Sequence, residues 1–294
     1  MKTQRIGILG LGWVGSQFRK YFEEVRGLKR GSTLLLYDID PKKNFSDDLN
    51  TADVVFVCLP TPRNANDGSC DISIVEEGIK KLNGDGKIVV IKSTAPPGTT
   101  EAFQKKYPKH TFLFSPEFLT ESNAWENFIH PDRQIVGFAR DNKDAALTVL
   151  SLLPQAAFMS PTKENSITAT EAEFIKYAGN VYLARKVNLA NVFAKAAEKL
   201  GANYDHIRIG MAADQRIGKS HLDVTHGGYR GFGGYCFPKD LDAFIHFAKA
   251  IGFEDGAQVL EADRKFNEDL LQSQGLTVAE VSVHKDALDK KFKS

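Results

Sequence analysis

A glycine pattern near the N-terminus constrains the fold of this chain more than any other feature. Gly10, Gly12 and Gly15 follow a short apolar run and open a stretch of helical composition. In that setting Gly10 would allow a tight turn, Gly12 would let backbone N–H groups approach a pyrophosphate, and Gly15 would let the helix pack closely on a sheet. The pattern predicts a dinucleotide site, with the pyrophosphate on the helix N-terminus beside Trp13 and Val14.

The second apolar run ends in an acidic residue. Asp38 follows Leu34–Tyr37 and lies about twenty residues beyond Gly15, as the dinucleotide pattern requires. A carboxylate at this position would accept a hydrogen bond from the ribose 2′-hydroxyl and would repel a 2′-phosphate. The sequence therefore predicts NAD rather than NADP as the cofactor.

Short β-rich runs alternate with helical stretches through the first half of the chain. This alternation predicts an α/β fold with βαβ units and a Rossmann-like, mainly parallel sheet. The expected strands are Arg5–Gly10, Leu34–Asp38, Val54–Leu59, Lys87–Lys92, Thr111–Ser115, Gln134–Phe138 and Ala156–Met159. The strand signals stop at about Thr162. The stretch Glu164–Leu200 contains no proline and ends at Gly201, a suitable C-cap, so it predicts one long helix.

We therefore expect an NAD-binding Rossmann-like domain over 1–162, an all-helical dimerisation and catalytic domain over 163–272, and a tail over 273–294. The apolar residues of the long helix occupy several faces, which indicates burial against both domains or against a second subunit. From Val281 onward the tail is lysine-rich and mostly polar, which predicts a frayed, solvated end.

Composition excludes several classes of partner. The chain has 38 basic and 37 acidic residues, a net charge of +1, so no net field attracts it to nucleic acid or to an anionic membrane. It has no stretch near the roughly 20 apolar residues of a membrane span, and no signal-peptide pattern. Three cysteines, an odd number, fit a reducing compartment, so we expect a cytoplasmic protein. The seven histidines form no convincing metal pair with another His or Cys, and we predict no metal site.

Three later strands end in polar or proline-containing loops. Ligands of parallel sheets bind beyond the carboxyl ends of the strands, so these loops would face the nicotinamide. For any one loop, an interpretation in which Pro, Ser and Thr only end strands and cap helices is sufficient. Three such loops on one edge favour a site. Their residues include Pro60, Thr61, Pro62, Ser93, Thr94 and Glu117.

Lys176 and Asn180 are four residues apart, so they share one face of the expected long helix. Continuing that face by heptads gives an apolar seam of small residues: Leu183, Val187, Ala190, Ala194 and Ala197. Two interpretations fit this pattern. Either a ligand or partner chain meets the two polar groups, which would otherwise be costly to bury, or the seam has reached solvent at the helix start.

The segment 227–240, Gly-Gly-Tyr-Arg-Gly-Phe-Gly-Gly-Tyr-Cys-Phe-Pro-Lys-Asp, is the richest in chemistry; we call it the glycine-rich segment. Pro238 suits the first turn of a helix, which places Cys236 at or just before a helix N-terminus. There the helix dipole and Lys239 would lower the pKa of the thiol, and the glycines would leave amides free for an oxyanion. These features favour a nucleophile. Cys58, inside an apolar run, fits the alternative of an inert small hydrophobe, and Cys70 gives no signal.

Together these motifs resemble the UDP-glucose/GDP-mannose dehydrogenase family of NAD-dependent nucleotide-sugar 6-dehydrogenases. The matching stretches, in chain order, are GLGWVG, the Asp38 strand end, LPTP, STAPPGT, SPEFLTESNAWENFIHPDRQIVG, EFIKYAGNVYLARKVNLAN, QRIG and GYRGFGGYCFPKD. The last three together are highly specific.

The resemblance implies a four-electron oxidation of a nucleotide-sugar alcohol with two NAD⁺, through a cysteine thiohemiacetal and a thioester. Cys236 matches the nucleophile. Lys176 and Asn180 match the pair that stabilises negative charge on the substrate oxygen. The remaining matches are Thr94 and Asp240 (water binding or proton transfer), Glu117 (thioester hydrolysis), Arg216 (reaching the substrate from a neighbouring subunit of a homodimer), and Phe118, Leu119, Lys239, Gly233 and Gly234 (the substrate loops).

The chain also departs from the family pattern. Only Ile39–Ala52 separates Asp38 from the third strand, where the family carries an additional helix and loop, and Val192 stands where glutamate is common. The printed sequence ends shortly after Asn267, so we expect no C-terminal UDP-binding domain. Local groups such as Arg216, Arg230 and Lys239 would then have to hold the charged substrate.

Two other functions fit parts of the pattern. A two-electron dehydrogenase of the β-hydroxyacid type shares a Rossmann domain and a helix with Lys and Asn, but needs no cysteine. An inactive NAD-binding module is the other alternative, since a missing closing domain would abolish turnover. The sequence names neither the nucleotide nor the sugar.

Overall fold

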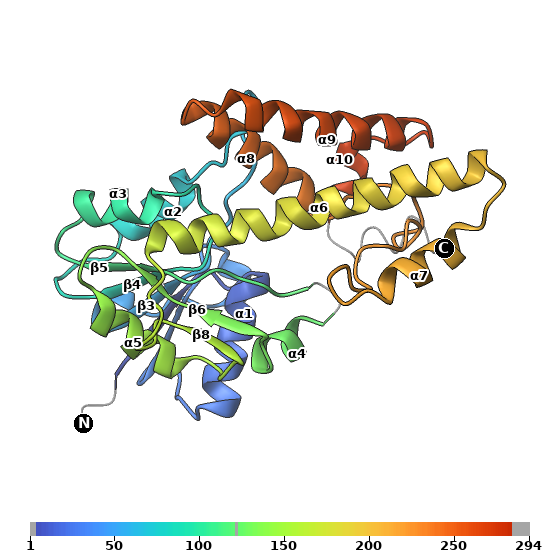
Figure 1. The fold of residues 1–294 in the computed structure, drawn as a ribbon. Coiled ribbons are helices and arrows are strands. Elements are labelled where there is room, and N and C mark those ends of the chain that lie inside the picture. Colours follow the sequence, from blue (N-terminus) through green and yellow to red (C-terminus); the bar gives the residue numbers. More distant parts are fainter. Residues whose placement is uncertain (1–3, 121–122, 284–294) are drawn as a thin grey trace. The chain divides into compact units, whose positions relative to one another are not determined.

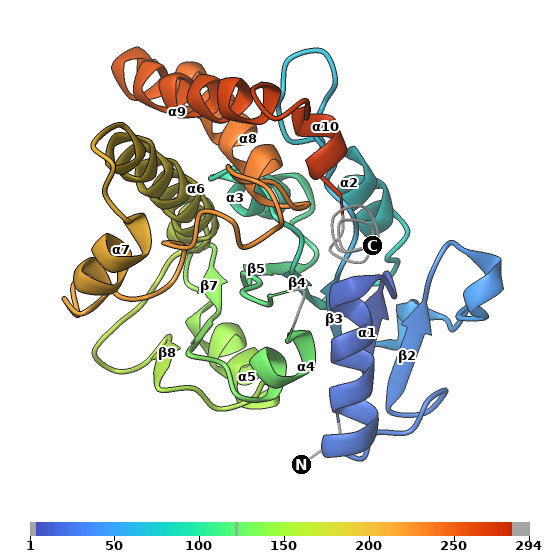
Figure 2. The same ribbon diagram turned by 90° about the vertical axis from the view of Figure 1, so that its right-hand side faces the viewer.

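The computed structural model describes residues 4–120 and 123–283 (Figures 1 and 2). The chain divides into two compact units. The first comprises 1–62 and 71–176, and the second comprises 63–70 and 177–294. The division passes through helix α6 (Ala169–Lys199), so that the first turns of this helix belong to the first unit and the remainder to the second.

A six-stranded sheet forms the centre of the first unit. Its strands are β1 (Ile6–Leu9), β2 (Leu34–Tyr37), β3 (Val54–Val57), β4 (Ile88–Ile91), β5 (Thr111–Phe114) and β7 (Gly137–Phe138). Their order is β2-β1-β3-β4-β5-β7, and every pairing is parallel except that of β5 with β7. The sheet is therefore mainly parallel, as predicted. The short connection between β2 and β3 returns the chain directly to the other side of β1, which makes the β1–β3 position the switch point where a ligand crevice is expected.

Helices cover both faces of this sheet, which is why its strands are nearly continuous apolar runs. One face packs against α1 (Trp13–Lys20), α4 (Ala124–Ile129) and α5 (Lys143–Leu152). The other packs against α2 (Ser73–Lys80), α3 (Thr99–Lys106) and the start of α6 (Figure 1). The first unit also contains the π-helical turn η1 (Tyr21–Val25) and the 3-10 turns η2 (Pro41–Lys43) and η3 (Leu49–Thr51).

One expected strand is two strands in the structure. Gln134–Phe138 divides at Val136 into β6 (Arg133–Ile135) and β7. Strand β6 pairs in parallel with β8 (Phe158–Ser160), and the Val136 N–H donates to the Ser160 carbonyl oxygen at 2.9 Å. The split occurs because each half finds its backbone partners in a different sheet.

The long helix was predicted over Glu164–Leu200 and is confirmed, with a later start. A capping box fixes that start: the Thr168 hydroxyl accepts from the Glu171 N–H, and the Glu171 carboxylate accepts from the Thr168 N–H. At the other end Gly201 has φ +65, and the Ala202 N–H donates to the Ala197 carbonyl, a Schellman ending.

The second unit is helical. It contains the rest of α6, together with α7 (Tyr204–Ala212), α8 (Phe237–Ala250), α9 (Glu254–Gln272) and α10 (Val278–Val281). Helices α8 and α9 run side by side in both views. The expectation of a solvated tail is wrong at its first residue, because Val281 is fully buried against Tyr229 and Leu271; the tail from residue 284 onward lies outside the described residues. No described helix is both long and apolar enough to cross a membrane.

Candidate active site

The predicted dinucleotide turn is present in the first unit. Gly10 has φ +94, and a Cβ there would lie 2.7 Å from the Cys58 carbonyl oxygen. A Cβ at Gly15 would collide with the Gly10 carbonyl oxygen, so this position also requires glycine. A Cβ at Gly12 would meet no atom within 4 Å. The backbone over this turn is therefore open where α1 begins, with Trp13 half-exposed in its first turn, and these residues fit a bound pyrophosphate.

Asp38 lies immediately after β2, and its carboxylate is tied to the glycine turn. Oδ2 accepts from the Leu11 N–H at 2.6 Å and from Lys43 Nζ at 2.8 Å, and Oδ1 accepts from the Asp40 N–H at 2.9 Å. Partial burial acts to raise the pKa of Asp38, but these hydrogen bonds and the charge of Lys43 outweigh it and lower the pKa. Asp38 is thus an ionised acceptor beside the turn, and the sequence did not predict its lysine partner.

The loops after β3, β4 and β5 are joined to one another along the same edge. The Ser93 hydroxyl donates to the Leu59 carbonyl at 2.6 Å, which links the loop that carries Thr94 to the Pro60–Pro62 loop. Lys92 Nζ donates to the Ser115 hydroxyl at 3.0 Å and to the Pro116 carbonyl at 3.2 Å. Because the strands are parallel, these predicted site residues share the edge at which ligands bind.

Lys92 was not identified from the sequence, although a charged residue at the end of a buried strand is an unusual signal. It is fully buried, and its ammonium group lies over the Phe18 ring, 5.1 Å from the ring centre. Burial lowers the pKa of Lys92 most strongly; the charge of Lys176 lowers it further, while Glu117 and Cys58 oppose the shift. Lys92 is a buried amine that holds the Glu117 loop to β4.

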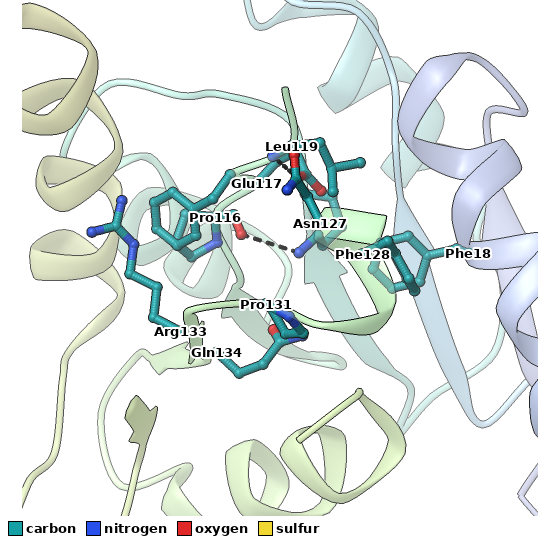
Figure 3. Close-up of a pocket in the computed structure, with 11 residues that line it drawn as sticks. Phe18, Pro116, Glu117, Leu119, Asn127, Phe128, Pro131, Arg133 and Gln134 are labelled. Atoms are coloured by element: carbon teal, nitrogen blue, oxygen red, sulfur yellow. Dashed lines mark hydrogen bonds between the residues drawn. The ribbon is translucent and has the colours of Figure 1, made fainter. Parts of the chain in front are cut away.

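Glu117 and its neighbours line a small pocket in the first unit (Figure 3). The Glu117 carboxylate accepts from the Leu119 N–H at 2.5 Å, and the Phe118 ring lies under the Arg133 guanidinium at 3.8 Å. The cavity has a volume of about 30 Å³, enough for roughly one or two water molecules. Its lining residues are Phe18, Lys92, Pro116, Glu117, Phe118, Leu119, Asn127, Phe128, Pro131, Arg133 and Gln134.

Lys176, at the end of the first unit, points back to this loop. It is buried, and its Nζ donates to the Glu117 carbonyl oxygen. The seam that begins with Lys176 and Asn180 stays buried or half-buried along α6, so the helix does not simply reach solvent at its first turns. In the first unit, Lys176 therefore lies beside the loop that contains Glu117, Phe118 and Leu119.

In the second unit, Cys236 lies at the position predicted for it. It is the N-cap of α8, with Pro238 in the first turn, and its side chain is exposed. The Asp240 N–H donates to the Cys236 carbonyl oxygen at 2.8 Å. One helical turn therefore separates the thiol from the Asp240 carboxylate.

Asp240 is fully buried and is the centre of a polar network. Asn180 Nδ2 donates to one carboxylate oxygen at 2.5 Å, and Lys239 Nζ donates to the other at 2.5 Å. Burial would lower the pKa of Lys239, but the carboxylate of Asp240 and the thiols of Cys70 and Cys236 raise it above its usual value. Lys239 is therefore a stable cation beside the cysteine. Cys70, for which the sequence gave no functional prediction, is close enough to interact electrostatically with Lys239.

The segment 63–70 belongs to this unit because it is pinned to α8. Arg63 Nε donates to Asp242 Oδ2 at 2.5 Å, and His246 lies 3.6 Å from Asp67. These pairs join residues about 180 positions apart, which no local sequence rule could predict.

The glycine-rich segment packs against α10. The Gly234 N–H donates to the Val281 carbonyl at 2.7 Å, and a Cβ at Gly233 would lie 2.6 Å from that same oxygen. Arg230 pairs with Glu198, whereas Arg216 is 90% exposed and pairs only with its neighbour Asp214 among the described residues.

Two family models match the chain, one for each half. The NAD binding domain of the UDP-glucose/GDP-mannose dehydrogenase family matches residues 39–151, and the central domain of that family matches residues 170–269. Together they span most of the chain, and the match to an NAD binding domain confirms NAD as the cofactor.

Curated relatives of this chain are named UDP-glucose 6-dehydrogenase. The chain is 36% identical over 220 residues to the UDP-glucose 6-dehydrogenase of Rhizobium meliloti (strain 1021), covering 70% of this chain and 49% of that protein. It is 30% identical over 290 residues to UDP-glucose 6-dehydrogenase TuaD of Bacillus subtilis (strain 168), covering 85% of this chain and 60% of that protein. The chain thus spans about half the length of the curated relatives it matches first.

Solved structures agree with this assignment. A UDP-glucose dehydrogenase from Pyrobaculum islandicum is 28% identical, with a TM-score of 0.75 over 92% of this chain and 71% of that one. A UDP-D-ManNAc dehydrogenase from Pyrococcus horikoshii shares the fold, with a TM-score of 0.76, 21% identity and coverage of 92% of this chain and 69% of that one. With its glycine turn, its Asn180–Asp240–Lys239 network and both domain matches, the chain belongs to the UDP-glucose/GDP-mannose dehydrogenase family.

Proposed function

We propose that this chain catalyses the NAD-dependent, four-electron oxidation of the C6 alcohol of a nucleotide sugar to a uronic acid, with UDP-glucose as the first substrate to test. The observation that carries the proposal is the polar network of the second unit, in which Asn180 and Lys239 hold Asp240 one helical turn after the exposed Cys236. The names of the relatives support the same substrate class.

The chemistry has two oxidations and a hydrolysis. Bound NAD would accept a hydride from C6 in each oxidation, so two NAD are consumed for each sugar. In the first, the alcohol loses a proton and the hydride and becomes an aldehyde. The Cys236 sulfur then adds to the aldehyde carbon as the thiol proton is lost, and the aldehyde oxygen gains a proton. Loss of the second hydride from the carbon and of the hydroxyl proton from this thiohemiacetal leaves a thioester. Water attacks the thioester carbon, which releases the carboxylate and restores the thiol.

The residues of each unit supply the charge stabilisation and proton transfer that these steps need. Lys176 and Asn180 would stabilise the negative charge that develops on the substrate oxygen. Thr94 and Asp240 would hold a water or assist the proton transfer. Glu117 would act as the base for hydrolysis; the water-sized cavity that it lines supports that role.

The substrate loops and the subunit contact belong to the same proposal. Phe118, Leu119, Gly233, Gly234 and Lys239 would line the nucleotide-sugar site. We expect a homodimer, with Arg216 reaching the substrate of its neighbour.

An exposed apolar stripe on α6 supports the dimer. Tyr182, Leu189 and Phe193 follow helical spacing on one face and are 65%, 51% and 37% exposed; a stripe of this kind is typical of an interface. Leu189→Glu should convert a dimer into monomers, measured by light scattering after size exclusion. A monomeric parent chain would contradict the dimer.

The deciding experiment counts NADH released for each UDP-glucose consumed. We expect two, and we expect Cys236→Ser to release no acid. Cys58→Ala, which alters a half-buried cysteine at the end of β3, is the matched control and should retain both NADH. One NADH per substrate together with full activity of Cys236→Ser would instead indicate a two-electron hydroxyacid-type dehydrogenase. Tight NAD binding with no reduction by any UDP- or GDP-sugar would indicate a binding module.

A further inference from the structure

Glu173 is a fully buried carboxyl group that the proposed reaction does not use. It lies on the first turns of α6, inside the first unit, and is 0% exposed. Its Oε2 accepts from the Gly98 N–H at 2.6 Å, and its Oε1 accepts from the Thr100 N–H at 2.8 Å and from the Thr100 hydroxyl at 2.6 Å. All three donors lie at the start of α3, because Gly98 is its N-cap and Thr100 is in its first turn.

Placing a carboxylate here has a clear cost. Burial raises the pKa of Glu173 to about 7, even though the hydrogen bonds from Thr100 and Gly98 lower it. The negative charge of Glu101 on α3 adds to the rise. An apolar side chain of similar volume could fill such a site without that cost. An apolar side chain could not fix the orientation of α6 relative to the start of α3. The three hydrogen bonds to the two oxygens of Glu173 fix both the distance and the angle between these segments.

Glu173 also lies on the helix face that carries Lys176. The two are three residues apart, so they are neighbours on α6. Lys176 donates to the Glu117 carbonyl, in the loop after β5, whereas Glu173 binds the loop after β4. Strands β4 and β5 are adjacent and parallel. The start of α6 is therefore attached to two neighbouring loops at two points one turn apart.

The packing around these two bonds leaves little freedom. Ala169 and Ala172 are fully buried in the same core cluster as α3. A Cβ at Gly137 on β7 would lie only 2.5 Å from the Thr168 carbonyl oxygen. The helix start can therefore slide or rotate only if the Glu173 bonds break.

We propose that Glu173 is a positioning residue that fixes the segment 93–100 against the Lys176 turn of α6, so that Thr94 and Lys176 keep one geometry toward the substrate oxygen. Its catalytic consequence rests on the proposed function, but the attachment itself does not. Glutamine cannot replace the carboxylate, because its NH₂ group would face one of the N–H donors.

The first test reads the attachment without any substrate. In the amide NMR spectrum of the full chain, the Gly98 and Thr100 N–H signals should titrate together with a midpoint near pH 7, because both donate to one titrating carboxyl. Glu173→Gln should abolish this titration. Glu76→Gln is the matched control: Glu76 is a first-unit carboxylate that accepts from Tyr107 at 2.7 Å, and its loss should leave the two signals unchanged. Independent titration of the two amides, or a titration that survives in Glu173→Gln, would overturn the proposal.

The second test measures the effect of the Glu173 attachment on kcat and KM. Glu173→Gln should lower kcat at least tenfold while changing the KM for the nucleotide sugar less than threefold. The milder Thr100→Val removes one of the three bonds and should lower kcat less, and the double variant should be no slower than Glu173→Gln alone, because both changes break one attachment. Full kcat in Glu173→Gln, or multiplicative losses in the double variant, would refute the positioning role. If the parent chain shows no turnover at all, the proposed function fails and the NMR test still decides the attachment.

Discussion

The ionisation of Glu173 predicts that the first unit loses stability as pH rises from about 4.5 to about 7. In the unfolded chain this carboxyl has its ordinary pKa near 4.5, whereas burial raises the pKa to about 7 in the folded unit. The folded state therefore binds the proton more tightly. Its contribution to the free energy of unfolding is fully present below pH 4.5 and is lost as pH rises through about 7. Each unit of pKa difference corresponds to about 1.4 kcal/mol, so the loss is about 3 kcal/mol.

The stability of the first unit can be measured separately, because both tryptophans of the chain lie in it. Both tryptophans, Trp13 and Trp125, lie in the first unit, so their fluorescence reports unfolding of the unit that contains Glu173. Urea unfolding at pH 5 and pH 8 gives the pH dependence for the parent chain and for Glu173→Gln. Every other titrating group is common to both proteins and cancels in the difference. Because part of the contribution is already lost at pH 5, we expect the parent to lose about 2.5 kcal/mol more than the variant between the two pH values. Equal losses would refute the assignment of the raised pKa to this burial.

Three further predictions concern the cofactor turn, the thiols and the chain end. Asp38→Ala leaves its lysine partner with a free positive charge beside the ribose site, so the preference for NAD over NADP should fall at least tenfold in Kd; an unchanged ratio would contradict the role of Asp38. At pH 8 iodoacetamide should label the exposed Cys236 but not Cys58, because burial raises the pKa of the Cys58 thiol to about 12; equal labelling, read by peptide mass spectrometry, would contradict this. Deleting 277–294 removes α10 from the glycine-rich segment and should change the labelling rate of Cys236, whereas deleting 284–294 should not; identical rates in both truncations would show that α10 does not hold the segment.

The features that the sequence predicted correctly all depend on local rules. The turn at Gly10 requires a positive φ, the long helix ends where Gly201 provides a left-handed cap, and Pro238 places Cys236 at the start of α8. Each rule needs only a few neighbouring residues. The alternation of apolar runs with helical stretches was likewise sufficient to predict a mainly parallel sheet. Strands that are buried on both faces are continuous runs of β-branched and aliphatic residues.

The features that the sequence did not predict depend on partners distant in the chain. Glu173 looks like any charged residue in a helix until its donors at Gly98 and Thr100, more than seventy positions away, are known. The segment containing Arg63 joins the second unit through the ion pairs of Arg63 with Asp242 and of Asp67 with His246. The expected strand at Gln134–Phe138 had the right composition, but which sheet each half would join was a choice among competing backbone partners.

A nearly neutral chain can still present positive charge to an anionic transition state if its buried cations are bonded to neutral groups. Lys92 donates to a hydroxyl and a backbone carbonyl, and Lys176 donates to the next carbonyl along the chain. Because the Lys176 bond goes to a carbonyl and not to a carboxylate, the positive charge of Lys176 is not cancelled by this hydrogen-bond partner. An ammonium group has three donors, so Lys176 can hold the Glu117 loop and still donate to a substrate oxygen. Lys239 differs, because the Asp240 carboxylate neutralises its positive charge. Lys239 would therefore orient neighbouring groups and would attract an anionic substrate only weakly. Under the proposed function, Lys176 would therefore supply positive charge that stabilises the developing alkoxide.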